Sequence, residues 1–483
     1  MKKIFICSCF LIALQSFAQE KTVWNLEQCI NYAIKNNVSV KQADVQARLA
    51  SIELDRAKYL IQPNINFSTN IGGQFGRSVD PTTNQFVSSQ LINNSYNVNA
   101  GIQLYNWGSL KLNKEIASFN AKASIVDVER VANDISLNIA TYYLQVLSAK
   151  QQLKIANIQI EQTQSQLKFT KLRVNAGSLP ELNAAEMEAQ LARDSSSFIS
   201  AKTNFELATI QLKAAINLDM ASEFEVATPA VESISVEPLM SLEPESLYKL
   251  ALTTQPIQKA NDLRLKSSLK AIDYSKTAFY PTISAYAGLN TRFANTNIKN
   301  NGFIYKGDVA TPAYTLNGTT KNYVYQPDYE YSSGKRGFFE MWDGWGNQLD
   351  QNFSQNIGIQ IQVPILNNGN SRLGYERAKL NYKNSEFTNE QANITLKQNI
   401  YQSFQNAKAA LQRFNISKRS VELAAIAYDF SKKRFEAGLG TTLDLLTNQN
   451  NFNRAQLDQL NNQFEYIFRM KLLEFYKGQG IKL

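Results

Sequence analysis

The feature that most constrains the fold of this chain is a run from Ser109 to Ala176 that contains neither glycine nor proline. Gly177 follows directly after it. Apolar residues recur in it at alternating steps of three and four, the spacing of a coiled-coil seam. At about 1.5 Å of rise per residue, one helix over this run would reach roughly 100 Å, several times the roughly 30 Å hydrocarbon core of a bilayer. We therefore expect one very long helix that projects into water and packs against partner helices. The seam comprises Ile125, Val128, Ala132, Ile135, Ile139, Tyr142, Val146, Ala149, Leu153, Ala156 and Ile160.

The long helical pattern occurs twice in the chain. A constant offset of 261 (357 − 96) aligns the segment that starts at Tyr96 with the segment that starts at Ile357, without a gap. The region just before it aligns with a smaller offset, 218 (281 − 63), so the second copy carries one insertion in a loop. An internal repeat makes the chain two copies of one supersecondary unit. The fold class that follows is mainly α, with a duplicated unit of two β-strands and a long helical hairpin.

Proline and glycine set the expected boundaries of the elements. Two short helices precede the strands of each repeat. The first repeat is expected over residues 19–218, with strands at about 64–76 and 95–105, a long helix at 109–176 and a return helix at 181–217. A connector between the repeats is expected at 219–243. The second repeat is expected over 244–483, with strands at about 282–293 and 353–363, a long helix at 370–437 and a return helix at 443–477.

The amino-terminal residues 1–18 have the pattern of a secretory signal peptide. Two lysines precede the apolar run Ile4 to Leu14, and small residues at Ser16 and Ala18 fit a cleavage site. Two of the three cysteines would leave with this peptide, so that only Cys29 remains. An exported chain with one cysteine has no intramolecular disulfide, and we expect packing alone to hold it together.

The expected strands alternate between an apolar and a polar face. Ile65, Phe67 and Ile71 fall on one side and are interleaved with asparagine and serine. A half-buried strand of a soluble sheet has this pattern, and so does a transmembrane barrel strand of about 9 to 11 residues. Four strands cannot close a transmembrane barrel, whose minimum is about eight, and lipid does not tolerate an open sheet edge. If these strands cross a membrane, several chains must share one barrel.

The composition argues against an enzyme and against nucleic-acid binding. The chain has no histidine, which excludes an imidazole base and histidine-ligated metals. It also lacks a phosphate-cradling GxxxxGK, a GxSxG elbow and cysteine pairs at zinc spacing. The net charge of +9 is spread along the helices and forms no basic block. We expect no catalytic residue, cofactor or metal, and no nucleic acid as partner.

Three local segments resemble the TolC-type outer-membrane efflux family, and the resemblance covers essentially the whole mature chain. Trp24 to Asn37 is similar to the family's opening helix, and Pro364 to Gly369 to its crossing from strand to helix. Arg434 to Leu446 resembles the periplasmic tip of the second hairpin. The resemblance implies a homotrimer in the outer membrane of a Gram-negative bacterium. Three chains would form a twelve-stranded β-barrel, continued by an α-helical coiled-coil tunnel through the periplasm.

The function implied by this resemblance is a passive exit duct of a tripartite efflux pump for drugs or other small molecules. The implied partners are outer-membrane lipid, a periplasmic adaptor protein and an inner-membrane transporter, which would supply the energy. An outer-membrane component of a type I protein secretion system is the alternative. An exported coiled-coil scaffold or adhesin would fit the heptads alone, and the alternating strands argue against it.

The resemblance also implies that the two helix reversals form a periplasmic gate and a docking surface for the adaptor. The family often carries two aspartates three residues apart here; Asp444 keeps the first, and Thr447 replaces the second. Gly440 stands where some relatives have a basic residue that helps to close the tip. A ring of carboxylates would favour cations, although Asp444 and Glu186 could equally serve only to favour helix amino termini. The candidate residues are Gly177, Pro180, Asn183, Glu186, Gly438, Gly440, Thr441, Asp444 and Thr447.

The insertion from Ala294 to Asn352 shows no clear pattern of helix or strand. It is rich in Asn, Gly and Tyr and contains Trp342 and Trp345. Because it joins two strands at the ends away from the long helices, we expect it to face the cell exterior. Its aromatic residues could cap the pore or contact an outside partner, and a self-packed surface loop is the open alternative.

Overall fold

The computed structural model describes residues 23–79, 84, 86–228 and 237–478. The predicted signal peptide, residues 1–18, lies outside the described residues. Contacts divide the chain into a helical unit of residues 1–54, 115–272 and 377–483 and a sheet unit of residues 55–114 and 273–376. The chain is mostly helical with a smaller β part, which confirms the predicted fold class in its coarse form. Among the described residues, every helix is either too short or too polar to span a bilayer.

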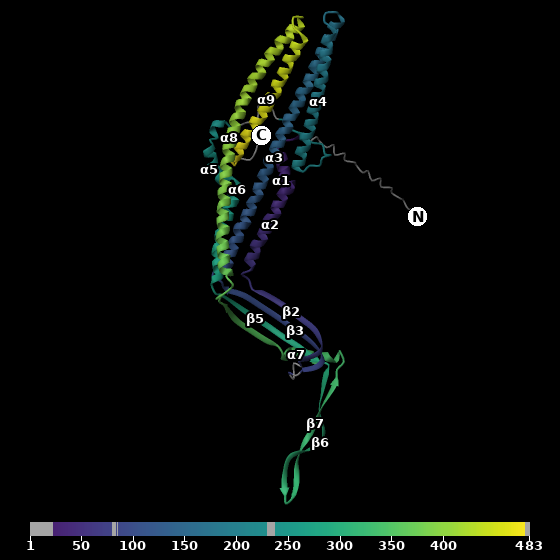
Figure 1. The fold of residues 1–483 in the computed structure, drawn as a ribbon, viewed down its shortest axis with the longest axis vertical. Coiled ribbons are helices and arrows are strands. Elements are labelled where there is room, and N and C mark those ends of the chain that lie inside the picture. Colours follow the sequence, from purple (N-terminus) through teal and green to yellow (C-terminus); the bar gives the residue numbers. More distant parts are fainter. Residues whose placement is uncertain (1–22, 80–83, 85, 229–236, 479–483) are drawn as a thin grey trace, which may run out of the picture. The chain divides into compact units, whose positions relative to one another are not determined.

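Two long helical hairpins dominate the helical unit. The first consists of α3 (Ser109–Asn175) and α4 (Glu181–Ile216), and the second of α8 (Asn370–Glu436) and α9 (Thr442–Tyr476). Each long helix has 67 residues, and every boundary lies within one residue of its prediction. In both hairpins the shorter helix runs back along the longer one (Figure 1).

Short helices cover each hairpin. Near the amino terminus, α1 (Leu26–Asn36) and α2 (Val38–Tyr59) follow each other, and the start of α1 is closed by a capping box between Asn25 and Gln28. In the second half, α5 (Pro244–Thr254) and α6 (Pro256–Lys276) take the corresponding place in the sequence. One core cluster joins α1 to α3, α4 and α9, and another joins α5 to α8 and α9.

Tyr143 and Cys29 belong to the first core cluster. Both side chains are almost fully buried, and the Tyr143 hydroxyl donates to the Ala227 carbonyl at 2.8 Å. This bond ties α3 to the connector, where a short parallel pairing joins β1 (Val23–Trp24) and β4 (Glu225–Val226). Burial raises the pKa of the Cys29 thiol to about 12, so the thiol stays protonated and inert.

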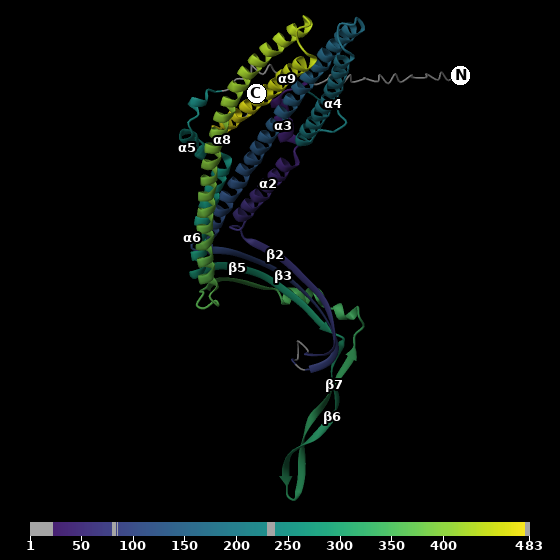
Figure 2. The same ribbon diagram turned by 45° about the horizontal axis from the view of Figure 1, so that its top comes forward.

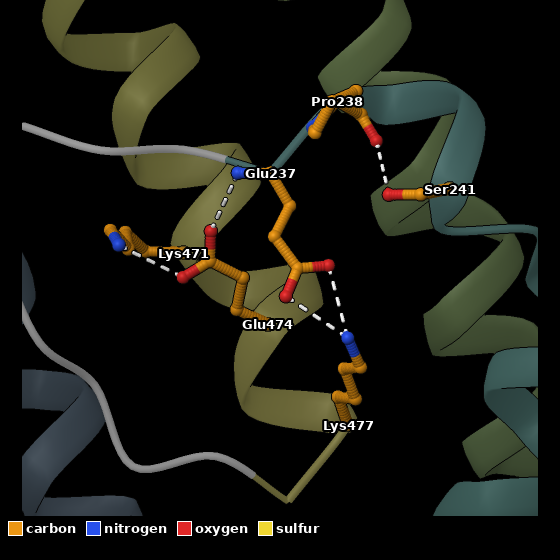
Figure 3. Close-up of polar contacts among 6 residues, drawn as sticks. All are labelled: Glu237, Pro238, Ser241, Lys471, Glu474 and Lys477. Atoms are coloured by element: carbon orange, nitrogen blue, oxygen red, sulfur yellow. Dashed lines mark hydrogen bonds and ion pairs between the residues drawn. The ribbon is translucent and has the colours of Figure 1, made fainter.

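The far end of the connector is held to α9 by charged groups (Figure 3). The Glu237 carboxylate pairs with Lys477 Nζ at 3.0 and 3.1 Å, and the Glu237 backbone N–H donates to Glu474. Lys471, which is largely buried, pairs in turn with Glu474 at 2.9 Å. The expected connector at 219–243 therefore contains ordered structure: β4, and the 3₁₀ turn η2 (Leu239–Ser241).

The sheet unit holds a four-stranded antiparallel sheet in the order β2-β3-β5-β8. Its strands are β2 (Asn64–Val79), β3 (Phe86–Tyr105), β5 (Thr282–Thr296) and β8 (Ser354–Gln362). The prediction that the second strand begins at about residue 95 was wrong, because pairing with β2 continues to Phe86. The apolar residues of this stretch come as adjacent pairs, Phe86-Val87 and Leu91-Ile92, so the two-residue alternation that identifies a strand is missing. The four strands lie side by side in both views (Figures 1 and 2).

The two crossings from strand to helix have the same backbone. Trp107 and Gly108 have φ of 54° and 77°, and so do Asn368 and Gly369. The offset between them is again 261 (368 − 107), which supports the proposed duplication. Two successive left-handed residues reverse the chain sharply, and glycine adopts this conformation without strain.

The insertion 294–352, in which the sequence showed no clear pattern of helix or strand, contains regular structure. β5 extends into it, and β6 (Ile298–Asn317) and β7 (Thr320–Lys335) then form a long two-stranded hairpin (Figure 2). The 3₁₀ turn η4 (Glu340–Trp342) and the helix α7 (Trp345–Gln351) follow before β8. The pairing of β6 with β7 shifts register three times, and these irregularities break the two-residue period that identifies a strand in sequence.

Candidate functional site

The predicted site consists of the two helix reversals, and each is built as a glycine-terminated helix end. At the first, Gly177 has φ of 66°, and the Ser178 N–H donates back to the Arg173 carbonyl at 2.9 Å. At the second, Gly438 has φ of 78°, and the Leu439 N–H donates to the Arg434 carbonyl at 2.8 Å. A left-handed glycine with this bond is the Schellman ending, which satisfies the last carbonyls of a helix and turns the chain.

The returning helices start differently. Pro180 occupies the cap position of α4 and makes no side-chain cap bond, whereas the Thr441 hydroxyl of α9 accepts from the Asp444 N–H at 3.1 Å. Gly440 lies between these features, and a Cβ added there would meet the Phe435 backbone nitrogen at 3.2 Å. Because Gly440 has no side chain, the turn can lie close to the end of α8.

The structure brings the two reversals into contact with each other. Asn183 Nδ2 donates to Thr442 Oγ1 at 2.6 Å, and Arg173 Nη1 donates to the Phe435 carbonyl at 2.9 Å. The Arg173 guanidinium also lies over the rings of Phe169 and Phe435, at 5.8 and 6.0 Å from their centroids. Buried residues from both hairpins, Met187 of α4 and Phe435, Leu445 and Leu446 of the second hairpin, form a small apolar cluster near the reversals.

The predicted carboxylates occupy different environments. Asp444 is exposed in the first turn of α9, and Glu186 is half-buried in α4. Thr447 is exposed, and the Asn183 side chain is hydrogen-bonded to Thr442. The expected acidic positions therefore supply one exposed and one half-buried carboxylate in each chain.

Further along the hairpins, a buried polar layer links three helices. The Asp194 carboxylate of α4, 6% exposed, accepts from Thr163 Oγ1 of α3 at 2.6 Å and from Gln190 Nε2 at 2.8 Å. Gln449 of α9 donates to Thr163 at 3.3 Å, and Gln190 also donates to Asn450 of α9 at 3.2 Å. The apolar seam of α4 in the sequence comprises Ala184, Met187, Leu191, Phe198, Ala201, Phe205, Ala208, Leu212 and Ala215. Asp194 is the one polar residue in this seam, and the network explains its presence there.

Residues 29–218 and 332–467 match the family model described as outer membrane efflux protein. The chain belongs to this family. The membership confirms the predicted function in its coarse form, an outer-membrane efflux channel. Both helix reversals lie within the matched segments, and most of the β6–β7 hairpin lies in the gap between them.

Individual relatives are distant in sequence but cover most of the chain. The pyoverdine export outer membrane protein OpmQ of Pseudomonas putida is 19% identical over an alignment of 468 residues that covers 94% of this chain and 85% of that protein. The outer membrane protein TolC of Escherichia coli is 21% identical over an alignment of 460 residues that covers 94% of this chain and 82% of that protein.

Solved structures show that the fold is shared. The outer membrane protein VceC of Vibrio cholerae superposes with a TM-score of 0.71 at 14% identity, covering 95% of this chain and 97% of that one. The CmeC outer membrane channel of Campylobacter jejuni gives a TM-score of 0.70 at 16% identity, covering 95% and 87%.

Sequence reasoning missed two residues of the contact between the reversals, Arg173 and Thr442. The repeat carried a signal for the first, because Arg173 aligns with Arg434 in a stretch of nine residues, 169–177 against 430–438, of which five are identical. Nothing in the pattern indicated Thr442, which lies next to the predicted Thr441. In the part of the chain that the structure describes, no group of three or more Cys, Asp or Glu residues is arranged to hold a metal ion.

Proposed function

We propose that the chain is one subunit of a passive exit duct, in which several copies share one membrane barrel. The observation that carries the proposal is the four-stranded sheet, which exposes one apolar face and ends in two open edges, β2 and β8. Each unpaired backbone group would cost several kcal/mol in lipid, and a barrel needs at least about eight strands. Edge strands of neighbouring copies must pair; the number of three copies comes from the family resemblance.

The dimensions of the apolar face suit a bilayer. It runs along β5 from Ile283 to Phe293, ten residues further, or roughly 34 Å at about 3.4 Å per residue. A strand tilt of about 40° reduces this to roughly 26 Å, close to the roughly 25 Å apolar band of outer-membrane barrels. On β8 the side chains of this face, such as Ile357 and Ile359, are among the most exposed apolar groups of the described chain.

Aromatic residues lie where the apolar face ends on the side of the long helices. Trp107 packs on Tyr280 at 4.7 Å and on Tyr105 at 5.3 Å between ring centroids. The Trp107 indole N–H donates to the Pro281 carbonyl, which fixes the ring at this level. Such residues form belts at the level of lipid headgroups. The other face of the sheet is rich in Asn, Gln and Ser and would line a water-filled lumen.

The contacts between the reversals support a gate at this end of the hairpins. The bonds from Arg173 and Asn183 hold the two hairpins of one chain together, and separating the hairpins would break both. The exposed Asp444 of each copy would contribute to a carboxylate ring at the entrance, and the same surface would dock a periplasmic adaptor. The duct would take its energy from an inner-membrane transporter, and it needs no cofactor or catalytic group.

Conductance and stoichiometry of the purified protein test the proposal. We expect a heat-modifiable oligomer, a trimer by native mass spectrometry, that forms cation-preferring pores in planar bilayers. A monomer that forms no pores under any salt or voltage would overturn the shared barrel. ATP hydrolysis by the purified chain would overturn the passive mechanism. A deletion strain tested against a panel of toxic compounds would distinguish small-molecule efflux from protein secretion.

A further inference from the structure

The segment that follows the β6–β7 hairpin packs onto the apolar face of the sheet. Trp342 of η4 stacks on Phe293 at 5.6 Å between ring centroids, and Met341 and Ile92 are buried beside them. Trp345 of α7 meets Tyr96 edge-on at 6.4 Å. Phe293, Ile92 and Tyr96 all belong to the apolar set of their strands, because residues paired across antiparallel strands lie on one face.

Hydrogen bonds fix this segment in place. The Thr291 hydroxyl donates to the Leu349 carbonyl at 2.6 Å, and the Asn352 side chain donates to the Arg292 carbonyl at 2.8 Å. At the other end, Arg336 Nη1 donates to Asn295 Oδ1 at 2.8 Å and to the Ile298 carbonyl at 3.1 Å. The segment is therefore a docked part of the sheet unit, with bonds at both ends.

The outer surface of the segment is aromatic. Phe338 is 64% exposed and Phe339 is 86% exposed, and their ring centroids lie 5.7 Å apart. Trp345 of the same segment is 39% exposed. Exposed Lys335 comes just before them in the chain. Burying the apolar area of two adjacent exposed phenylalanines is favourable, so a surface that covers them would stabilise the assembled protein.

We propose that residues 336–352 are a membrane-interface anchor, with Phe338, Phe339 and Trp345 inserted among the acyl chains just below the lipid headgroups. The inference rests on the proposed membrane sheet. The segment lies on the same face as the exposed apolar band, at the end of the sheet opposite Trp107 and Tyr280. Bulky aromatic side chains favour this level of a bilayer. A second copy would attach through the edge strands β2 and β8, in the plane of the sheet, and so would leave this face to lipid.

With the long helices in the periplasm, as proposed above, the register of the sheet puts the anchor in the outer leaflet. The start of β2, the end of β3, the start of β5 and the end of β8 share one end of the sheet, and all four connect to the helices. The insertion leaves from the opposite end. The anchor and the Trp107 belt would therefore bound the apolar band on its two sides and fix the depth of the barrel.

Depth measurements with a nitroxide label test the anchor in the mature protein without residues 1–18, which lacks Cys7 and Cys9, reconstituted in phosphatidylcholine vesicles. Single cysteines replace Phe338, Ile359 or Leu316 in a Cys29→Ala background; these three side chains are equally exposed, at 64, 67 and 66%. The ratio of oxygen to nickel-chelate accessibility rises with depth. We expect the highest ratio for Ile359 in β8, the lowest for Leu316 in the hairpin, and an intermediate ratio for Phe338. A label at Phe339→Cys should agree with the label at Phe338→Cys.

The three positions separate failure of the anchor from failure of the channel. If Ile359→Cys reports lipid while Phe338→Cys and Phe339→Cys match the water-exposed Leu316→Cys, the anchor is wrong and the membrane sheet stands. If the labels at 338 and 339 are shielded from both oxygen and nickel, protein covers this surface, and the anchor is again wrong. If Ile359→Cys itself reports water, the proposed barrel is wrong.

Discussion

Replacing Arg173 with alanine should shift the proposed gate toward its open state. The change removes the bond from Arg173 Nη1 to the Phe435 carbonyl and the stacking on two phenylalanine rings. A hydrogen bond to a charged group contributes about 1.5–3 kcal/mol. The Phe435 carbonyl keeps a second donor, the Gly438 N–H at 3.0 Å, so it is not left unpaired, and the lower value of about 1.5 kcal/mol applies. Since about 1.4 kcal/mol corresponds to a factor of ten, the opening equilibrium of each chain should change about tenfold.

Single-channel recording in planar bilayers measures this shift as the fraction of time spent in the high-conductance state. Lys171→Ala is the matched control, because it removes a positive charge two residues away. Its pair with Glu188, 2.6 Å long and about half exposed, joins α3 to α4 within one hairpin. Such an exposed pair contributes about 0–1 kcal/mol. An unchanged open fraction for a folded, oligomeric Arg173→Ala protein would refute the reasoning, as would an equal change for Lys171→Ala.

Three further predictions concern charge, buried polarity and the thiol. Asp444→Asn with Glu186→Gln should reduce cation preference at low ionic strength, read from the reversal potential in a salt gradient; unchanged selectivity would leave these carboxylates only a role at the helix amino termini. Asp194→Ala leaves the buried Thr163 hydroxyl without its acceptor, while Gln190 Nε2 keeps its bond to Asn450, and should lower the free energy of unfolding by about 1–3 kcal/mol. In denaturant titrations Asp194→Asn, which keeps an acceptor, should lose clearly less, and equal losses would contradict the network. Because the folded-state pKa of Cys29 is raised to about 12, its contribution to stability should be complete below about pH 9, the ordinary thiol range, and decline above it. Unfolding midpoints at pH 8 and 10 should therefore differ more for the native chain than for Cys29→Ala.

The sequence determined the helical architecture. Coiled-coil spacing without glycine or proline places α3 and α8 to within one residue, because a long helix is set by local hydrogen bonds and a periodic apolar stripe. The positions of the reversals could also be predicted from the sequence, because Gly177 and Gly438 adopt the left-handed conformation that other residues avoid. Asp194 was visible as a polar residue in an apolar seam, although the sequence did not reveal its partners.

The β-strands could be predicted only in part from the sequence. The alternation of Ile357 and Ile359 with polar residues predicts β8 well. The early part of β3 and both strands of the hairpin were missed, because a strand is completed by hydrogen bonds to a neighbour distant in sequence. Pairing with β2 carries β3 back to Phe86, and the register shifts between β6 and β7 erase the alternation.

Tertiary structure alone decided which distant residues meet. Arg173 and Phe435 are separated by 262 residues, and only the packing of one hairpin on the other brings the guanidinium to that carbonyl. The place of Trp342 and Trp345 on the apolar face of the sheet likewise depends on how the end of the insertion folds back. Local pattern fixes elements whose bonds lie within a few residues of each other, whereas the gate contacts and the aromatic segment depend on side-chain packing between elements that no local period encodes.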